Sequence, residues 1–73
     1  MHNGSMTTET GLTIPGTTLR AQRKGYGILA RDVAAKLGHH RNTIRAWEND
    51  PAVDVRRQRL YLAALRELAR ESA

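Results

Sequence analysis

Cysteine is absent from this 73-residue sequence, which excludes disulfide bonds and thiolate metal sites. No apolar run approaches the roughly 20 residues that a membrane-spanning helix requires. The N-terminus has neither an apolar signal core nor a basic leader. We therefore expect a soluble, cytoplasmic protein that makes no contact with a membrane.

Aromatic residues are scarce, since Tyr26, Trp47 and Tyr61 are the whole set. The length sets a ceiling of one small domain. Residues 1–16 hold mainly Gly, Ser, Thr and Asn and are predicted to form a flexible tail, in which residues 1–5 read as a cloning remnant. The domain is expected over residues 17–73, with Tyr26 packed on its core.

The sequence also lacks the residue patterns of catalytic and metal-binding sites. It contains no nucleophile with a matched base, no paired carboxylates and no Gly-rich phosphate loop, so we expect no catalytic residues and no enzyme activity. His39 and His40 are adjacent and point in different directions, with no further ligand at metal spacing. Neither a metal nor a cofactor is expected.

Acidic residues are outnumbered, with 7 Asp and Glu against 12 Lys and Arg and a net charge of +5. All the basic residues follow position 19, so the tail carries none of them. A positive charge of this density favours a polyanionic partner.

The sequence predicts two short helices joined by a sharp turn, over about Leu29–Leu37 and Arg41–Asn49. Gly38 lies between them, where a left-handed backbone angle is easiest for glycine. Ile44 and Trp47 share one face of the second helix and can pack on the first. This arrangement is typical of a helix-turn-helix, whose second helix is free to enter a DNA major groove.

The outward face of the second helix carries side chains that suit base edges. At about 100° per residue this face gathers arginine, asparagine and a small apolar residue. Arginine pairs with guanine, asparagine with adenine, and a methyl group contacts the thymine methyl. We expect base contacts from Arg41, Asn42, Arg45 and Ala46. A merely solvated polar face is the alternative for any one of them.

A third helix is expected to begin near Thr17 or Thr18, either of which can cap it, and to stop at Gly25 or Gly27. A long last helix follows Asp54, which is placed to cap it. Its apolar arc faces the core, and Leu60 falls outside that arc. The fold class is therefore all-α, a small bundle of four to five helices.

With these residues in view, the chain resembles the lambda-repressor-like helix-turn-helix family of phage repressors, Cro proteins and related XRE-type regulators. The residues that match run without a gap from Leu19 to Asn49: Arg20, Arg23, Ile28, Val33, Ala34, Leu37, Gly38, Ile44, Trp47, Glu48 and Asn49. The resemblance implies a structural ion pair between Arg23 and Glu48. It also implies binding to double-stranded DNA at a palindromic operator, commonly as a homodimer, and so association with the nucleoid.

Three residues depart from the family pattern. Leu29 stands where a Ser or Thr usually caps the helix, Ala30 where a Gln often touches phosphate, and Asp50 where a glycine is usual. Arg31 is available to replace the lost phosphate contact. Together with the basic start of the last helix, this predicts phosphate contacts from Arg31, His40, Thr43, Asn49, Arg56 and Arg57.

The leading interpretation is a sequence-specific transcriptional regulator, either a complete Cro-like protein or a fragment of a longer repressor. Its dimer, which DNA could induce, would use Leu60 and Leu68 of the last helix. The alternatives are a protein-interaction module such as an antitoxin or anti-repressor, and an excisionase-like architectural factor. Salt-sensitive binding to duplex DNA separates the first alternative from the leading interpretation.

Overall fold

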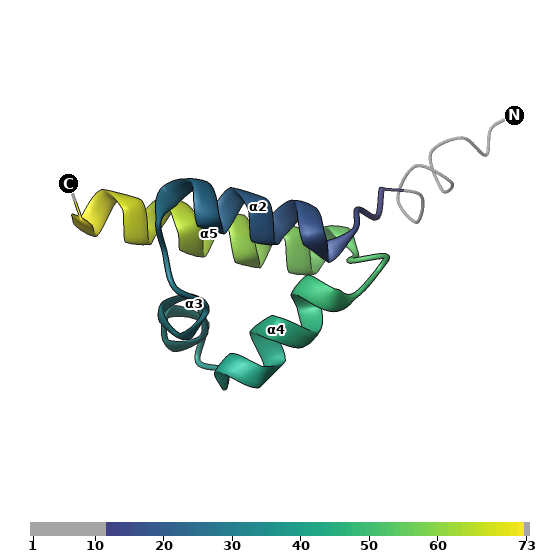
Figure 1. Cartoon of the computed structure of the whole chain (residues 1–73), viewed down its shortest axis with the longest axis horizontal. Coiled ribbons are helices and arrows are strands. Elements are labelled where there is room, and N and C mark those ends of the chain that lie inside the picture. The colour runs from purple at the N-terminus through teal and green to yellow at the C-terminus, as the bar shows by residue number, and fades with distance from the viewer. Residues whose placement is uncertain (1–11, 73) are drawn as a thin grey trace, which may run out of the picture.

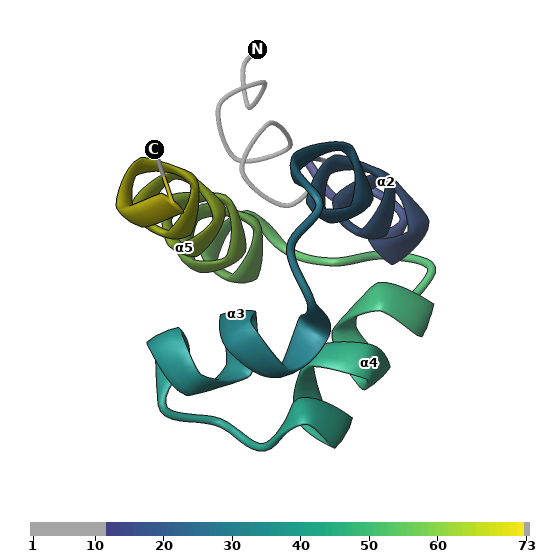
Figure 2. The ribbon, with the colours of Figure 1, turned by 60° about the vertical axis from the view of Figure 1, so that its left-hand side comes forward.

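The computed structural model describes residues 12–72, and this part of the chain contains four α-helices. They are α2 (Gly16–Tyr26), α3 (Ala30–Leu37), α4 (Arg41–Asn49) and α5 (Val55–Ser72). α2 and α5 lie side by side, and α3 and α4 lie together beneath them (Figures 1 and 2). The predicted all-α bundle with a helix-turn-helix is therefore confirmed, with four helices in the described residues.

Glycines in the left-handed conformation end the first two of these helices. Gly27, with φ of 73°, follows α2, and Gly38, with φ of 74°, follows α3. A side chain at either position would be strained by about 1–2 kcal/mol. Gly38 thus turns the chain between α3 and α4, as the sequence predicts.

The start of α2 differs from the prediction. Pro15 occupies the N-cap position in place of Thr17 or Thr18, and no side chain caps the helix. The Gly16 amide donates instead to the carbonyl of Asp50, at 2.7 Å. A backbone hydrogen bond to the residue after α4 therefore satisfies an amide at the start of α2, where a side-chain cap was expected.

The last residues of the predicted tail are fixed against the domain. Ile14 and Val53 form an antiparallel bridge, with N–H to O=C distances of 3.1 and 2.7 Å. The side chain of Gln58 donates to the Leu12 carbonyl. Residues 12–15, ahead of α2, thus lie against the loop after α4 and the start of α5. Residues 1–11, including the expected cloning remnant, lie outside the described residues.

The core draws on each of the four helices and on the loop after α4. Its largest fully buried side chains are Leu19, Val33, Ile44, Val53, Tyr61 and Leu65. Tyr26 was expected to pack on the core and is instead 50% exposed, whereas Ile28, two residues further on, is buried in the core. Within residues 12–72 no helix has the length and apolar character needed to cross a membrane.

Candidate nucleic-acid interface

Helix α4 is anchored through one side only. Ile44 is fully buried and Trp47 is half-buried against the core, in agreement with their predicted inward positions. The opposite side is open to solvent along its whole length. The exposed residues are those that the sequence assigns to this face: Arg41, Asn42, Arg45, Ala46 and Asn49. They form a continuous polar row, which we call the α4 face.

The turn before α4 is closed by His40. Its Nδ1 accepts the backbone N–H of Asn42 at 3.0 Å and so caps the helix. An imidazole that accepts through Nδ1 carries its proton on Nε2. Because the His40 side chain is exposed, Nε2–H is available as a donor beside the first turn of α4. Thr43, in the same turn, is half-buried, and Arg31 is exposed on α3.

A buried ion pair joins α2 to α4. Nε of Arg23 donates to Oε2 of Glu48 at 2.7 Å, and Nη2 donates to Oε1 at 3.1 Å. The third nitrogen, Nη1, donates to the Ile28 carbonyl at 2.9 Å, and the Tyr61 hydroxyl donates to Glu48 as well. The pair that the resemblance implies is present, and α5 contributes a further hydrogen bond through Tyr61.

Neighbouring groups keep this pair charged. Burial raises the pKa of the Glu48 carboxyl, but hydrogen bonds from Arg23 and Tyr61 and the positive charges of Arg23 and Arg20 outweigh it. The pKa of Glu48 therefore lies below its ordinary value. The hydrogen bond to Glu48 raises the pKa of Arg23. Burial, together with the Glu48 carboxylate, raises the pKa of Tyr61, so that its hydroxyl stays a donor.

Arg57, in the first turn of α5, is held against the loop that follows α4. Its Nη2 lies 3.0 Å from Oδ2 of Asp50, its Nε lies 3.3 Å from Oδ1 of Asp54, and its guanidinium stands 5.9 Å from the centre of the Trp47 ring. Asp54 also caps α5 through the Arg57 amide, as the sequence predicts. Two carboxylates thus pair with Arg57, and its expected contact with phosphate stays a prediction.

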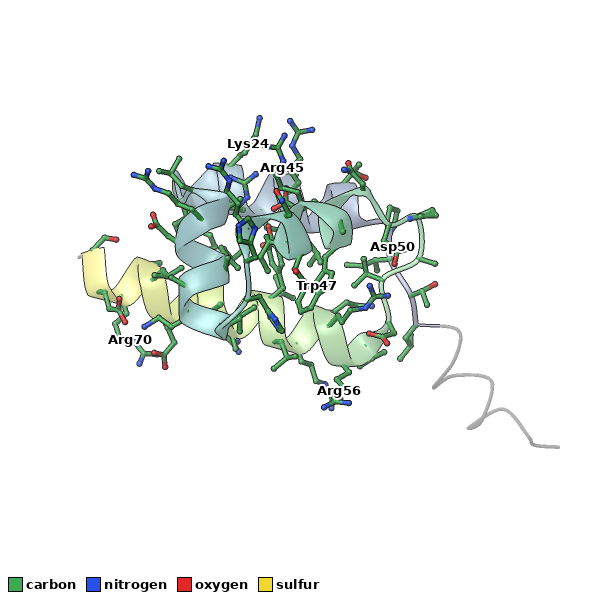
Figure 3. The ribbon with its side chains drawn as sticks, turned by 90° about the horizontal axis from the view of Figure 1, so that it is seen from below. Lys24, Arg45, Trp47, Asp50, Arg56 and Arg70 are labelled. Carbon is green, nitrogen blue, oxygen red and sulfur yellow. The ribbon has the colours of Figure 1, made fainter. Side chains whose placement is uncertain are left out.

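Arg56 and Arg45 point to different sides of the molecule. In Figure 3 Arg45 lies with Lys24 along one edge, whereas Arg56 lies near the opposite edge on α5. The structure thus does not bring Arg56 to the α4 face. The sequence could not show this, because the direction of α5 depends on the path of the loop over residues 50–53.

The structure adds two basic residues that the sequence did not single out for binding. Arg20 and Lys24 of α2 lie on the rim of a hollow of about 400 Å³ beside the α4 face. Their spacing of four residues places both on one side of a helix, so the sequence could have indicated a shared basic surface. The sequence does not show that this surface lies beside α4, because that depends on the packing of α2 against α4. Among residues 12–72 no group of three His, Cys, Asp or Glu side chains is arranged to hold a metal ion.

An anchored turn, a free second helix and a row of base-compatible side chains define a helix-turn-helix DNA-binding domain. A family model described as "Helix-turn-helix" (HTH_3) matches residues 19–66. The chain belongs to this family, which is the lambda-repressor-like one, and is a DNA-binding regulator of the XRE type. No curated protein and no solved structure matched the chain.

Proposed function

We propose that the protein is a small repressor or Cro-like regulator that recognises one operator sequence through α4. The observation that carries this proposal is the α4 face, which stays free of the core while Ile44 and Trp47 hold the opposite side. Arg41 and Arg45 suit guanine, Asn42 suits adenine, and the Ala46 methyl suits thymine. The arrangement lets α4 lie in a major groove without any change in the packing of the helices.

Phosphate contacts would hold α4 in that groove. The Nε2–H of His40 is exposed at the start of α4, and Asn49 is exposed at its end. Arg31 on α3 and Thr43 in the first turn of α4 are further candidates beside the same groove. Contacts of this kind fix the register of the protein and carry no sequence information.

We also propose that two copies bind a palindromic operator and meet through α5. Leu60 is 42% exposed and borders a hollow of about 380 Å³ that is mostly apolar, lined by Val55, Arg56, Arg59, Leu60 and Ala63. Leu68, the other expected contact, packs partly against the core and is left out of this interface. A domain this small gains stability from association, because its own core is limited.

The test is selection of bound duplexes from a random pool, followed by sequencing and by titrations at several salt concentrations. We expect a short enriched site, arranged as an inverted repeat, with binding that weakens steeply as salt rises. An enriched site without two-fold symmetry would remove the palindrome and the dimer from the proposal. Absence of duplex binding even at low salt would overturn it and favour a protein-interaction module.

A further inference from the structure

A third hollow lies between α2 and α5, which run side by side (Figures 1 and 2). Its volume is about 210 Å³, and it is lined by Gln22, Tyr26, Leu62, Leu65 and Arg66. The two residues from α2 are one turn apart, and so are Leu62 and Arg66 of α5, so that each pair shares one side of its helix. We call this space the α2–α5 hollow. Its lining includes no residue of the α4 face.

Tyr26 places an exposed aromatic ring at the edge of this hollow. The ring is 50% exposed, although the sequence led us to expect it in the core. Leu65 is fully buried, and Leu62 is half-buried against the core, so the apolar part of the lining is fixed in place. Exposed aromatic residues beside apolar hollows are characteristic of protein interfaces. The α2–α5 hollow thus offers a seat for one apolar side chain of a partner.

Arginines border the hollow along α5. Arg66 lines it, and at about 100° per residue Arg59 and Arg70 fall within about 40° of Arg66 around the helix axis. We call these three residues the α5 arginine row. All three are exposed, and within residues 12–72 none of them forms an ion pair with a carboxylate. Their positive charge is therefore available to an acidic partner.

The acidic residues of the same part of α5 are directed to another neighbour. Glu67 and Glu71 follow Arg66 and Arg70 directly, so they lie about 100° further around the helix. Both carboxylates pair with Lys36 of α3. Helix α5 therefore turns its carboxylates toward α3 and leaves its arginines unbalanced. In Figure 3 Arg70 lies away from Arg45, so the α5 arginine row does not belong to the α4 face.

We propose that the α2–α5 hollow and the α5 arginine row together bind an acidic amphipathic helix of a partner protein. An apolar side chain of that helix would fill the hollow beside Tyr26. Carboxylates one turn apart would accept paired hydrogen bonds from Arg66 and Arg70, which have the same spacing. This role goes beyond operator recognition, because a duplex on the α4 face would leave the surface free.

Two other occupants fit the surface less well. A nucleic-acid backbone has the required charge, but it has no apolar side chain with which to fill the hollow. A second copy of this chain has acidic residues on α5, but Lys36 already pairs with Glu67 and Glu71. A partner protein that carries both an apolar and an acidic face matches both parts of the surface.

The first experiment measures the binding of two labelled helical peptides of about 16 residues by fluorescence anisotropy. Both carry leucine along one face, and the positions that flank this face are Glu in one peptide and Gln in the other. We expect the Glu peptide to bind at least about tenfold more tightly, with an affinity that falls as salt rises. Equal affinities of the two peptides would overturn the proposal.

The second experiment compares two variants that each remove one positive charge. Arg66→Gln should weaken binding of the Glu peptide at least about tenfold and leave operator affinity within about twofold of the wild type. Arg45→Gln, on the α4 face, should do the reverse. Both residues are exposed, so both variants should fold. Equal loss of peptide binding in the two variants would mean that only the net charge attracts the peptide, and the proposal would fail.

The third experiment examines the hollow itself. Tyr26→Gln should weaken binding of the Glu peptide at least about fivefold, because an aromatic contact at the interface is lost. Urea melts establish that this variant is folded. Backbone amide shifts of Gln22 and Leu62 in the wild type, on addition of the peptide, locate the site without any substitution. Unchanged shifts, or full peptide affinity in the folded variant, would exclude the hollow as the seat.

The remaining measurements distinguish the other occupants. Wild-type protein on a tethered operator duplex is offered a second, unrelated duplex. Capture of that duplex, abolished by Arg66→Gln, would make the surface a nucleic-acid site and overturn the proposal. Loss of a two-protomer operator complex in Arg66→Gln would identify a second copy as the occupant, with the same consequence. If the wild type binds no duplex, the proposed function fails, whereas the peptide measurements still decide this proposal.

Discussion

Gly16 occupies a position where even a methyl group has no room. A Cβ atom there would lie 2.0 Å from the Trp47 carbonyl oxygen and 2.6 Å from the carbonyl carbon and oxygen of Glu48. These are backbone atoms of α4, so they cannot rotate away. We expect Gly16→Ala to lower the free energy of unfolding by at least about 1–3 kcal/mol, measured by urea melts.

Gly25 supplies the matched control for this substitution. It also lies in α2, and a Cβ atom there would meet nothing within 4 Å. Gly25→Ala should therefore leave the stability unchanged or raise it by up to about 1 kcal/mol, through helix propensity alone. Coincident melts of Gly16→Ala and the wild type would mean that α2 and α4 do not approach as closely as described.

The free energy of unfolding should depend on pH through the carboxyl group of Glu48. Its pKa is lower in the folded chain than in the unfolded chain. The stability that it contributes is therefore complete above the unfolded pKa of about 4.3, and it is lost as the pH falls through the lower, folded pKa. Breaking a buried pair by Glu48→Gln should cost roughly 3–5 kcal/mol at neutral pH, because the Arg23 charge is left unpaired.

Urea melts between pH 2 and pH 7 measure this contribution, and the wild type should lose stability below about pH 4 more steeply than Glu48→Gln. Tyr61→Phe gives a milder comparison, since it removes one hydrogen bond to Glu48 and keeps the ion pair. Its acid dependence should lie between the other two. Parallel pH profiles for all three proteins would show that the pair does not govern acid stability.

Among the helices, α4 has a buried side that packs on the core and an exposed side that we propose contacts DNA. Arg41 lies on the α4 face in the first turn, away from the buried Ile44. We expect Arg41→Ala to reduce discrimination between operator and scrambled duplexes by roughly 1–3 kcal/mol, because a base contact is lost. Arg70→Ala should leave this discrimination as it is. Full operator preference in Arg41→Ala would mean that α4 does not read the groove as proposed.

The loop between α4 and α5 is held in place by side-chain contacts. Asp50 accepts the Ala52 amide at 2.9 Å, and Arg57 binds both Asp50 and Asp54 while it stands over Trp47. The ring of His39 meets Trp47 edge-on, with 5.6 Å between the ring centres. Trp47 therefore links the turn before α4 to the loop after it, and this keeps the orientation of α4 fixed at both ends.

At the scale of the whole molecule, the two proposed surfaces lie on different helices. The α4 face belongs to α4, whereas the hollow beside Leu60 is lined by residues of α5. Figure 1 shows α4 beneath the layer that contains α5. We expect sedimentation at saturating protein to give two protomers on a palindromic duplex. Leu60→Asp should abolish the cooperativity of binding, because a charge would be buried in an apolar contact.

Leu12→Asp is the control for this prediction, because Leu12 is also an exposed leucine, at 52%, and lies outside that hollow. It should leave the cooperativity unchanged. One protomer per duplex at saturation, on a palindromic site, would contradict the dimer.

Local signals in the sequence predict the four helices and, apart from Tyr26, the side of each helix that is buried. Amphipathic spacing, the glycines at 27 and 38 and the carboxylate of Asp54 are local signals, and they act within a few residues. The exposed row on α4 follows from the same periodicity, once Ile44 is known to face inward. The Arg23–Glu48 pair spans 25 residues, and only resemblance to a family could suggest it.

The partner of each long polar side chain depends instead on how the helices pack together. Arg57 is bound by Asp50 and Asp54, Arg56 points away from Arg45, and Arg20 joins Lys24 around a hollow beside the α4 face. The physical reason is that these contacts depend on how separate helices and their loops are placed in space. Helical periodicity fixes the direction of a side chain relative to its own axis and carries no information about the neighbour it meets there.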